Sequence, residues 1–377
     1  MPSYQDYINT LLLGTYIPKI KIELLRDDET TKEEITSLIS NTNGNLSVKR
    51  NNGIRRSVNF DIINLDNKYL PNIETFFVRQ KFKLYLGLEL PDKTDYFLPQ
   101  GIYVIEDPSA TSNYSESLIS IQASDKFSLL SSIGGELVNT YIINIGTKIS
   151  TAIMAVLSLS GDPKTPIIDS SVAYLTTPYT MTFEAGSSLG DIIVELSQLY
   201  ACSCYYNENG QLVISKDIDD GIKSSLWDYN TSEFAYLGGT NQFKWSDLYN
   251  SVMVQGLNID GVAVSYKAIN NSLLSPTSVN NLRFERTFFH QSDTLSTEQQ
   301  CIDLANYILK RKTAVQNTVQ INSIKMYHLN PDEIITLTDE KLGLNKERFI
   351  IDSFSLSLNT SGTLSLNVVK SKEIPFI

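Results

Sequence analysis

The stretch from Phe349 to Val369 constrains the fold more than any other part of this sequence. Large apolar residues alternate there with small polar ones on both sides of a polar break, Asn359 to Gly362. Because successive side chains of a strand point to opposite faces, a period of two places the apolar residues on one buried face. The stretch is therefore predicted to be a β-hairpin, in which the glycine supplies the positive φ that a short connection needs.

An amphipathic helix is predicted before this hairpin, from Thr297 to Lys312. Its apolar residues recur at helical spacing and form one stripe, made of Cys301, Leu304, Ala305 and Ile308. Ser296 and Gln299 match a capping box, which satisfies backbone N–H groups at the start of a helix. One helix laid on a strand-rich module is therefore the expected unit at this end of the chain.

The chain divides into two strand-rich parts around a mixed one. At 377 residues it is too long for one ordinary core. Residues 1–125 are predicted to form a first β module, 126–240 an inserted α+β domain, and 241–377 a second β module that carries the helix. Strands with one apolar face usually curl into a sandwich or small barrel. The predicted fold class is mainly β, with two β-barrel-like tube modules, an inserted α/β domain and one helix packed on the C-terminal module.

Hydrophobic periodicity and turn residues place the individual elements. In the first module we predict a short helix at 1–13 and strands at 20–25, 53–65, 81–90, 101–105 and 118–123. In the inserted domain we predict helices at 147–159 and 188–200, capped by Thr147 and Ser188, and a hairpin of 202–206 with 212–215. In the second module we predict further strands at 251–256, 261–268, 284–289, 315–324 and 333–337. The sequence contains no repeat that we detect.

Charge and hydropathy argue against several classes of protein. The formal net charge is −11 and the pI is near 4.8, whereas proteins that grip phosphate backbones carry clustered Lys and Arg. No stretch is long and apolar enough for a membrane helix. The start, Met1 to Asp6, lacks the basic and apolar regions of a secretory signal. The chain is therefore expected to be made in the cytoplasm, where it stays or which it leaves by another route.

The cysteines are expected to have a packing role. Cys202 and Cys204 share one face of a predicted strand, where thiols fill a core or an interface more often than they bind zinc. A zinc site would need further ligands nearby, and the only histidines, His290 and His328, lie far away in the sequence. The third cysteine is Cys301, in the apolar stripe of the C-terminal helix.

Catalytic motifs are missing from the sequence. It has no phosphate-binding glycine loop, nucleophile elbow, zinc-protease helix or EF-hand loop. His290 is expected to be a hydrogen-bonded surface residue rather than a base. Glu184, Asp191 and Glu195 are candidates for a glycosidase pair, although Asp191 is explained by helix capping and Glu195 lies one turn along the same helix. For Asp217–Asp220 a solvated turn is preferred over a Ca²⁺ loop. No catalytic, cofactor-binding or metal site is predicted.

Aromatic and basic residues offer weaker candidates. The aromatic residues Tyr205, Tyr206, Trp227, Trp245, Phe288 and Phe289 would suit a carbohydrate-stacking surface. Such residues more often form a core or a subunit contact. Basic residues cluster weakly at Lys49, Arg50, Arg55 and Arg56, and again at Lys310, Arg311 and Lys312. The second cluster is expected to offset the dipole at the C-terminus of the predicted helix.

The order of these elements resembles the baseplate-hub proteins of tailed phages and related contractile injection machines. It is also similar to the N-terminal structural region of the tail-associated proteins of long-tailed phages. The segments that carry the resemblance are 53–60 (GIRRSVNF), 98–104 (LPQGIYV), 189–196 (LGDIIVEL), 205–213 (YYNENGQLV), the helix 297–312 and the closing hairpin. In element order the resemblance covers nearly the whole chain.

This resemblance implies a structural protein of the virion tail tip. Hub proteins form a ring, usually a trimer, whose two tube modules per chain give six similar wall segments. Such a ring continues the tail tube, adapts sixfold to threefold symmetry, and lets DNA and the tape-measure protein pass without holding the DNA. The other implied partners are tail-tube or distal tail proteins and a tail-tip fibre, spike or lytic protein. No enzymatic activity and no cofactor are expected, since the chain ends at Pro375–Ile377 without the extension that carries lytic activity in longer members.

Two alternatives remain open at this point. The first is a tail-associated enzyme that cleaves glycan or peptidoglycan with a carboxylate pair, which zymography would reveal. The second is a carbohydrate-binding receptor module that uses exposed aromatic residues, which binding to host cells would reveal.

Overall fold

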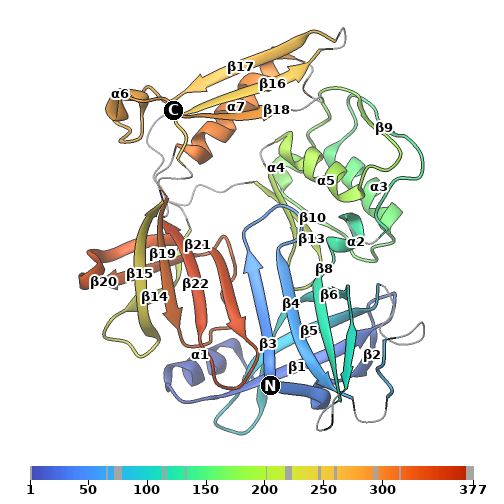
Figure 1. Ribbon diagram of the computed structural model, residues 1–377, viewed down its shortest axis with the longest axis vertical. Coiled ribbons are helices and arrows are strands. Elements are labelled where there is room, and N and C mark those ends of the chain that lie inside the picture. Colours follow the sequence, from blue (N-terminus) through green and yellow to red (C-terminus); the bar gives the residue numbers. More distant parts are fainter. Residues whose placement is uncertain are drawn as a thin grey trace.

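The computed structural model is mainly β, as the sequence predicted, with several sheets and a mixed inserted domain (Figure 1). It describes residues 2–64, 67–71, 79–112, 114, 117–131, 134–200, 202–216, 223–244, 248–258, 261–291, 295, 297–313 and 316–370. In Figure 1 two β modules occupy the lower half, the inserted domain lies at the upper right, and a smaller helix-covered sheet lies at the top. Within the described residues, no helix combines the length and the apolar composition needed to cross a membrane.

The first module consists of one α-helix and strands joined mostly as antiparallel neighbours. Its elements are α1 (Tyr4–Leu12), β1 (Ile17–Leu25), β2 (Thr31–Glu34), β3 (Ile39–Lys49), β4 (Arg56–Ile63), β5 (Lys81–Glu89), β6 (Asp95–Ile105), β7 (Ser109–Ser112) and β8 (Ser117–Asp125). They are arranged in the order β3-β4-β8-β6-β5-β1-β2, with β7 beside β8. In β4 the alternate residues Val58, Phe60 and Ile62 are buried, as their period of two predicted. Strands β2, β3 and β7 were not predicted.

The second module contains the predicted C-terminal hairpin. Its elements are β14 (Ser225–Asn230), β15 (Tyr236–Lys244), β19 (Gln316–Ser323), β20 (Ile334–Asp339), β21 (Leu344–Ser357) and β22 (Leu364–Lys370). β21 and β22 pair as antiparallel neighbours, which confirms the hairpin. The expectation for its glycine is wrong, because the φ of Gly362 lies outside the left-handed region. A Cβ there would lie only 2.9 Å from Asn359 Oδ1, so a larger residue would have to displace the Asn359 side chain.

The two modules share one sheet. β21 pairs with β3, with Phe354 opposite Val48 and Leu356 opposite Leu46, and all four side chains belong to one hydrophobic core that extends through both modules. The path therefore runs without interruption from β15 through β21 and β3 to β2. No sheet within the described residues closes on itself. Since β3 was not predicted, this seam could not be found from the sequence.

The inserted domain has its own hydrophobic core. Its elements are α2 (Ser128–Ser131), β9 (Tyr141–Ile143), α3 (Ile149–Ser160), β10 (Ile167–Ile168), α4 (Ser170–Ala173), β11 (Met181–Phe183), α5 (Leu189–Gln198), β12 (Cys202–Tyr206) and β13 (Leu212–Lys216). Both thiols of β12, Cys202 and Cys204, lie in this core. Ser188 caps α5 as predicted. The predicted cap of α3 is wrong, since Lys148 and not Thr147 occupies that position.

The core of the inserted domain is built on an internal repeat. β9 begins at Tyr141 and β11 at Met181, so each strand-helix unit recurs after 40 residues. The contacts between the units are reciprocal: Gly146 N donates to Thr177 O, and Gly186 N donates to Leu137 O. β9 and β11 pair as antiparallel strands, with Ile142 opposite Thr182, its equivalent 40 residues later. This approximate twofold symmetry was missed in the sequence, where few residues at the equivalent positions are identical.

A smaller sheet covered by one helix completes the fold. Its elements are β16 (Ser251–Leu257), β17 (Ala263–Ile269), α6 (Val279–Leu282), β18 (Thr287–Gln291) and α7 (Glu298–Lys312). α7 packs on β16 and β17 through a separate core. The predicted helix is present, but its capping box is formed by Thr297 and Gln300, one residue later than predicted. The domain boundaries at 125 and 240 stay predictions.

Candidate functional site

The tip of the β3–β4 hairpin joins the first module to the inserted domain and to the second module. Gly53 N donates to Cys204 O over 2.9 Å, and Asn52 Oδ1 accepts from Cys204 N over 3.3 Å, so the tip pairs with β12 of the inserted domain. On the other side, Arg50 N donates to Asp352 O of β21. Gly53 has a φ of 90°, which a residue with a side chain rarely adopts. The tip is therefore a connector between the inserted domain and the second module.

The buried side chain of Arg55 contacts both of the parts that this connector joins. Its side chain is only 2% exposed, and its Nη1 lies 2.7 Å from Asp332 Oδ2 in the second module. The guanidinium carbon lies 3.4 Å from the centre of the Tyr205 ring of β12, a distance at which cation and ring attract each other. Arg50 Nε binds the other oxygen of Asp332 over 2.5 Å. One carboxylate therefore ties two arginines of the first module to the second.

The neighbouring Arg56 makes a second set of bonds across the junction. Its Nη1 donates to Gln100 O over 3.1 Å, and its Nη2 donates to Asn330 Oδ1 over 2.6 Å. Asp125 accepts the backbone N–H groups of Arg55 and Arg56, each over 2.8 Å. Burial raises the pKa of Asp125 to about 6, against which these hydrogen bonds act. The four residues 55, 56, 125 and 332 form what we call the arginine junction.

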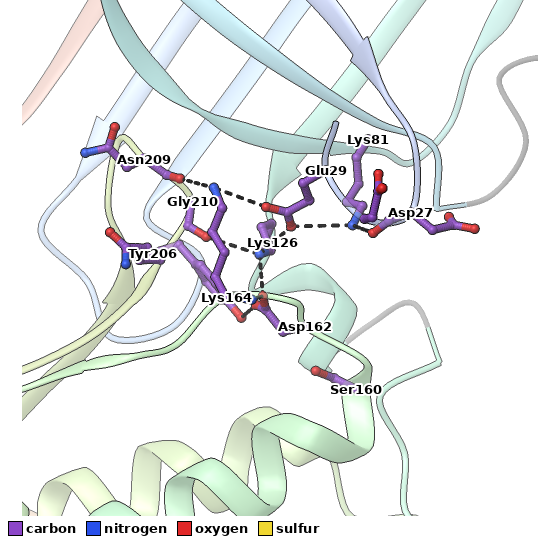
Figure 2. A network of polar contacts seen from close by, with 12 residues as sticks. Asp27, Glu29, Lys81, Lys126, Ser160, Asp162, Lys164, Tyr206, Asn209 and Gly210 are labelled. Carbon is purple, nitrogen blue, oxygen red and sulfur yellow. Dashed lines mark hydrogen bonds and ion pairs between the residues drawn. The ribbon is translucent and has the colours of Figure 1, made fainter. Parts of the chain in front are cut away.

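A second charged network joins the first module to the inserted domain (Figure 2). Lys126 Nζ lies 2.6 Å from Glu29 Oε1 and 2.7 Å from Asp162 Oδ1, and donates to Gly210 O over 3.1 Å. Lys164 Nζ approaches the second oxygen of Glu29 at 3.1 Å. Glu29 belongs to the turn between β1 and β2, whereas Asp162 follows α3. We call this set, with Lys81 and Tyr206, the lysine network.

A cavity of about 920 Å³ lies beside the lysine network. Its wall combines Leu25 to Asp27 and Arg79 to Lys81 of the first module with Ser160 to Pro163 of the inserted domain. Lys81 Nζ reaches Asp27 O over 2.8 Å and Glu29 Oε1 over 3.4 Å. Tyr206 also lines the cavity and donates its hydroxyl to Asp162 over 2.6 Å. The cavity is therefore bounded by both parts that the network connects.

The three carboxylates that are candidates for a glycosidase pair do not lie together at the cavity. Asp191 and Glu195 lie one turn apart on α5, and Glu184 accepts a hydrogen bond from Thr140 over 3.1 Å. None of the three lines the cavity. The candidate Ca²⁺ loop, Asp217–Asp220, lies outside the described residues. Among the residues that the structure does describe, no group of three His, Cys, Asp or Glu side chains is arranged to hold a metal ion.

The two histidines lie in separate parts of the fold. His290 is on β18, and partial burial lowers its pKa. His328 is partly buried beside Tyr7 and Trp227, with 3.2 Å between its Nδ1 and the Tyr7 hydroxyl, and this burial lowers its pKa to about 4. Neither of them lines the cavity. His328 therefore serves the packing of α1, whose Tyr7 also contacts Tyr96 of β6.

The aromatic candidates do not share one surface. Tyr205 stacks on Arg55 and Tyr206 is buried in the lysine network, while Trp227 packs against His328. Phe289, on β18 of the smaller sheet, is 72% exposed. Trp245 lies outside the described residues. Of the basic clusters, residues 49–56 form the connector, and Lys312 lies 4.8 Å from the centre of the Phe288 ring.

Solved structures share this fold over almost its whole length. One is the 43 kDa tail protein of prophage MuSo2 from Shewanella oneidensis, with a TM-score of 0.64, 13% identity, and coverage of 93% of this chain and 98% of that one. A second is the tail protein from Neisseria meningitidis MC58, with a TM-score of 0.67, 9% identity, and coverage of 94% and 97%. A third is the prophage tail protein gp18 from Listeria monocytogenes EGD-e, with a TM-score of 0.58, 10% identity, and coverage of 94% and 95%.

Comparisons based on sequence alone found no match. No protein-family model matches the chain, and no curated protein sequence matches it. The likeness therefore lies in the overall fold, which is shared although only about a tenth of the residues are identical. The chain has the fold of phage tail proteins, as its resemblance to the baseplate-hub family predicted.

Proposed function

We propose that the chain is a structural hub protein at the tip of a phage tail or of a related injection machine. The observation that carries this proposal is the shared fold: three solved tail proteins match at least 93% of this chain and at least 95% of their own length. The three solved proteins are named as tail proteins, and none of the candidate carboxylates Glu184, Asp191 and Glu195 lines the cavity. We infer that the protein is not an enzyme.

The hub would be a ring of three copies. Each copy would provide two wall segments, because β21 and β3 join the two modules into one sheet with a shared core. A ring of head-to-tail contacts also covers strands such as β15 and β2, which end the sheet in the described part of the chain. Six wall segments would continue a sixfold tail tube while three subunits present threefold symmetry to the tip.

The interior of the ring would let DNA and the tape-measure protein pass. A net charge of −11 supports this, because an acidic wall repels the phosphate backbone instead of binding it. The partners would be tail-tube or distal tail proteins on one side and a fibre, spike or lytic protein on the other. In such an assembly the arginine junction would keep the inserted domain at a fixed angle to the wall.

Light scattering and electron microscopy of the purified protein test this proposal. We expect a particle of three times the 42.3 kDa chain mass, seen as a threefold ring with a central opening. Co-expression with the matching tail-tube protein should yield a complex. A stable monomer that also fails to bind the tube protein would contradict the proposal. Zymography on peptidoglycan should show no clearing, and clearing would favour the glycan-cleaving alternative.

A further inference from the structure

The cavity beside the lysine network carries an excess of positive charge. Its charged lining residues are five cations, Arg26, Lys32, Arg79, Lys81 and Lys126, and two acids, Asp27 and Asp162. The chain as a whole is strongly acidic, with a formal net charge of −11. A concave surface lined by one sign of charge concentrates ions of the opposite sign. The cavity is therefore expected to attract anions, although the protein as a whole repels them.

The buried charges beside the cavity are balanced by one another. Lys81 and Lys126, whose side chains are 9% and 1% exposed, both contact Glu29, and Lys126 also contacts Asp162. The side chains of Glu29 and Asp162 are 3% and 4% exposed. The excess of positive charge therefore lies on the exposed lining residues Arg26, Lys32 and Arg79. An anion bound in the cavity would offset this charge.

Tyr206 adds no negative charge to the cavity. Burial raises the pKa of its phenol far above the ordinary value, so the hydroxyl stays protonated. That hydroxyl donates its hydrogen to Asp162 over 2.6 Å. The ring can attract the ammonium group of Lys126, which lies 5.1 Å from its centre, but it adds no full charge. The lining residues therefore keep an excess of cations.

Hydrogen-bond donors remain at the cavity for such an anion. Lys81 uses two of its three N–H groups, for Asp27 O and Glu29. Arg26 uses its Nη1, which donates to the turn and to β2. Lys32 and Arg79 line the cavity and make no hydrogen bond or ion pair with any residue that the structure describes. Guanidinium and ammonium groups together are the usual ligands of phosphate oxygens in proteins.

We propose that this cavity binds a small phosphate-bearing anion with more than one phosphoryl group. A volume of about 920 Å³ lies within the range of small-molecule sites and exceeds what a single phosphate fills. The ligand would contact the first module through Arg79 and Lys81 and lie against the inserted domain at Ser160 and Gly161. It would strengthen the contact between these two parts. The proposal does not depend on the ring described above.

Calorimetric titration of the full chain with pyrophosphate, at constant ionic strength set with sodium chloride, tests this site. The double variant Lys32→Ala/Arg79→Ala removes two exposed cations that take no part in the lysine network, so it should fold. Pyrophosphate affinity should fall about tenfold for each charge-assisted hydrogen bond that is lost. The matched control is Lys148→Ala/Arg283→Ala, which removes the same charge at the start of α3 and after α6. Its affinity should equal that of the unmodified protein.

Three results would overturn the proposal. The first is the absence of saturable binding of pyrophosphate. The second is an equal loss of affinity in the two double variants, which would mean a response to net charge alone. The third is that a short single-stranded oligodeoxynucleotide or an acidic peptide binds through Lys32 and Arg79 while pyrophosphate does not. That result would assign the cavity to a macromolecular partner.

Discussion

Glu29 and Lys126 form a buried ion pair, with 2.6 Å between Glu29 Oε1 and Lys126 Nζ, that joins the first module to the inserted domain. Glu29 has a φ of 63°, a left-handed conformation that residues other than glycine adopt at a cost. Lys126 directly follows β8, where the chain leaves the first module. The strained turn therefore directs a carboxylate at the start of the inserted domain.

The substitution Glu29→Gln should lower the free energy of unfolding by about 3 kcal/mol, because it removes the carboxylate that Lys81, Lys126 and Lys164 share. Urea unfolding followed by fluorescence measures this change. The control is Glu34→Gln on β2, where the side chain is exposed and the expected change is below about 0.5 kcal/mol. Equal values for the two variants would show that the network does not stabilise the fold.

The substitution Arg55→Lys keeps the charge beside Asp332 but loses the planar group that stacks on Tyr205. We expect a loss of about 1–2 kcal/mol, with faster hydrogen exchange in β12, because stacking and forked hydrogen bonding disappear together. Hydrogen exchange with mass spectrometry measures the effect at 202–206. Arg26→Lys, at an exposed position, should leave β12 unchanged. Protection of β12 at the original level in Arg55→Lys would contradict the role given to the junction.

Stability should depend on the protonation of Glu333. Burial raises the pKa of this carboxyl to about 7, above the ordinary value near 4.5, so the folded protein binds its proton more tightly than the unfolded chain does. The contribution of Glu333 to stability therefore falls as the pH rises from about 4.5 to about 7. Glu333→Gln should remove this part of the dependence, on the order of 1–2 kcal/mol once solvent screening is allowed for.

Urea unfolding of both proteins at pH 5 and pH 7.5 measures that difference. The two proteins should differ more at the higher pH, where the original protein must keep a half-buried carboxylate ionised. Glu340→Gln, which changes an acid beside the turn after β20, is the control and should leave the pH profile unaltered. Parallel profiles for Glu333→Gln and the original protein would count against the prediction.

Tyr7→Phe should destabilise the docking of α1. The Tyr7 hydroxyl accepts a hydrogen bond from Tyr327 N over 2.9 Å and lies beside His328, while its ring packs against Tyr96. Removing the hydroxyl leaves a buried N–H group without a partner, which costs about 1–3 kcal/mol. Thermal unfolding measures the loss, and Tyr4→Phe, at a side chain that is 45% exposed, should change little. An unchanged melting temperature in Tyr7→Phe would contradict this account.

Local patterns predicted much of the secondary structure. The hairpin of β21 with β22, the helices α5 and α7, and the alternation in β4 follow from side-chain periods that are written in contiguous residues. The strand β3 has a weaker pattern, because the sequence at 41–43 consists of Asn and Thr residues. The strand that unites the two modules was therefore the one that periodicity did not reveal.

The sequence indicated only some of the residues that form the arginine junction and the lysine network. Arg50, Arg55 and Arg56 stood out as a weak basic cluster, but Arg55 and Asp332 are 277 positions apart, and no spacing rule connects residues so distant. Glu29 and Lys126 carry no motif at all. The 40-residue repeat escaped for a different reason: reciprocal hydrogen bonds between backbone groups preserve it, and these place few demands on side chains.

The sequence by itself determined many of the strands and helices, the acidic balance and the general class of the fold, because these depend on the period and composition of neighbouring residues. Only the tertiary structure decided that two modules form one sheet and that buried lysines gather at a cavity. Those features depend on contacts between segments that lie far apart in the chain, and such contacts are set by packing and by the pairing of buried charges.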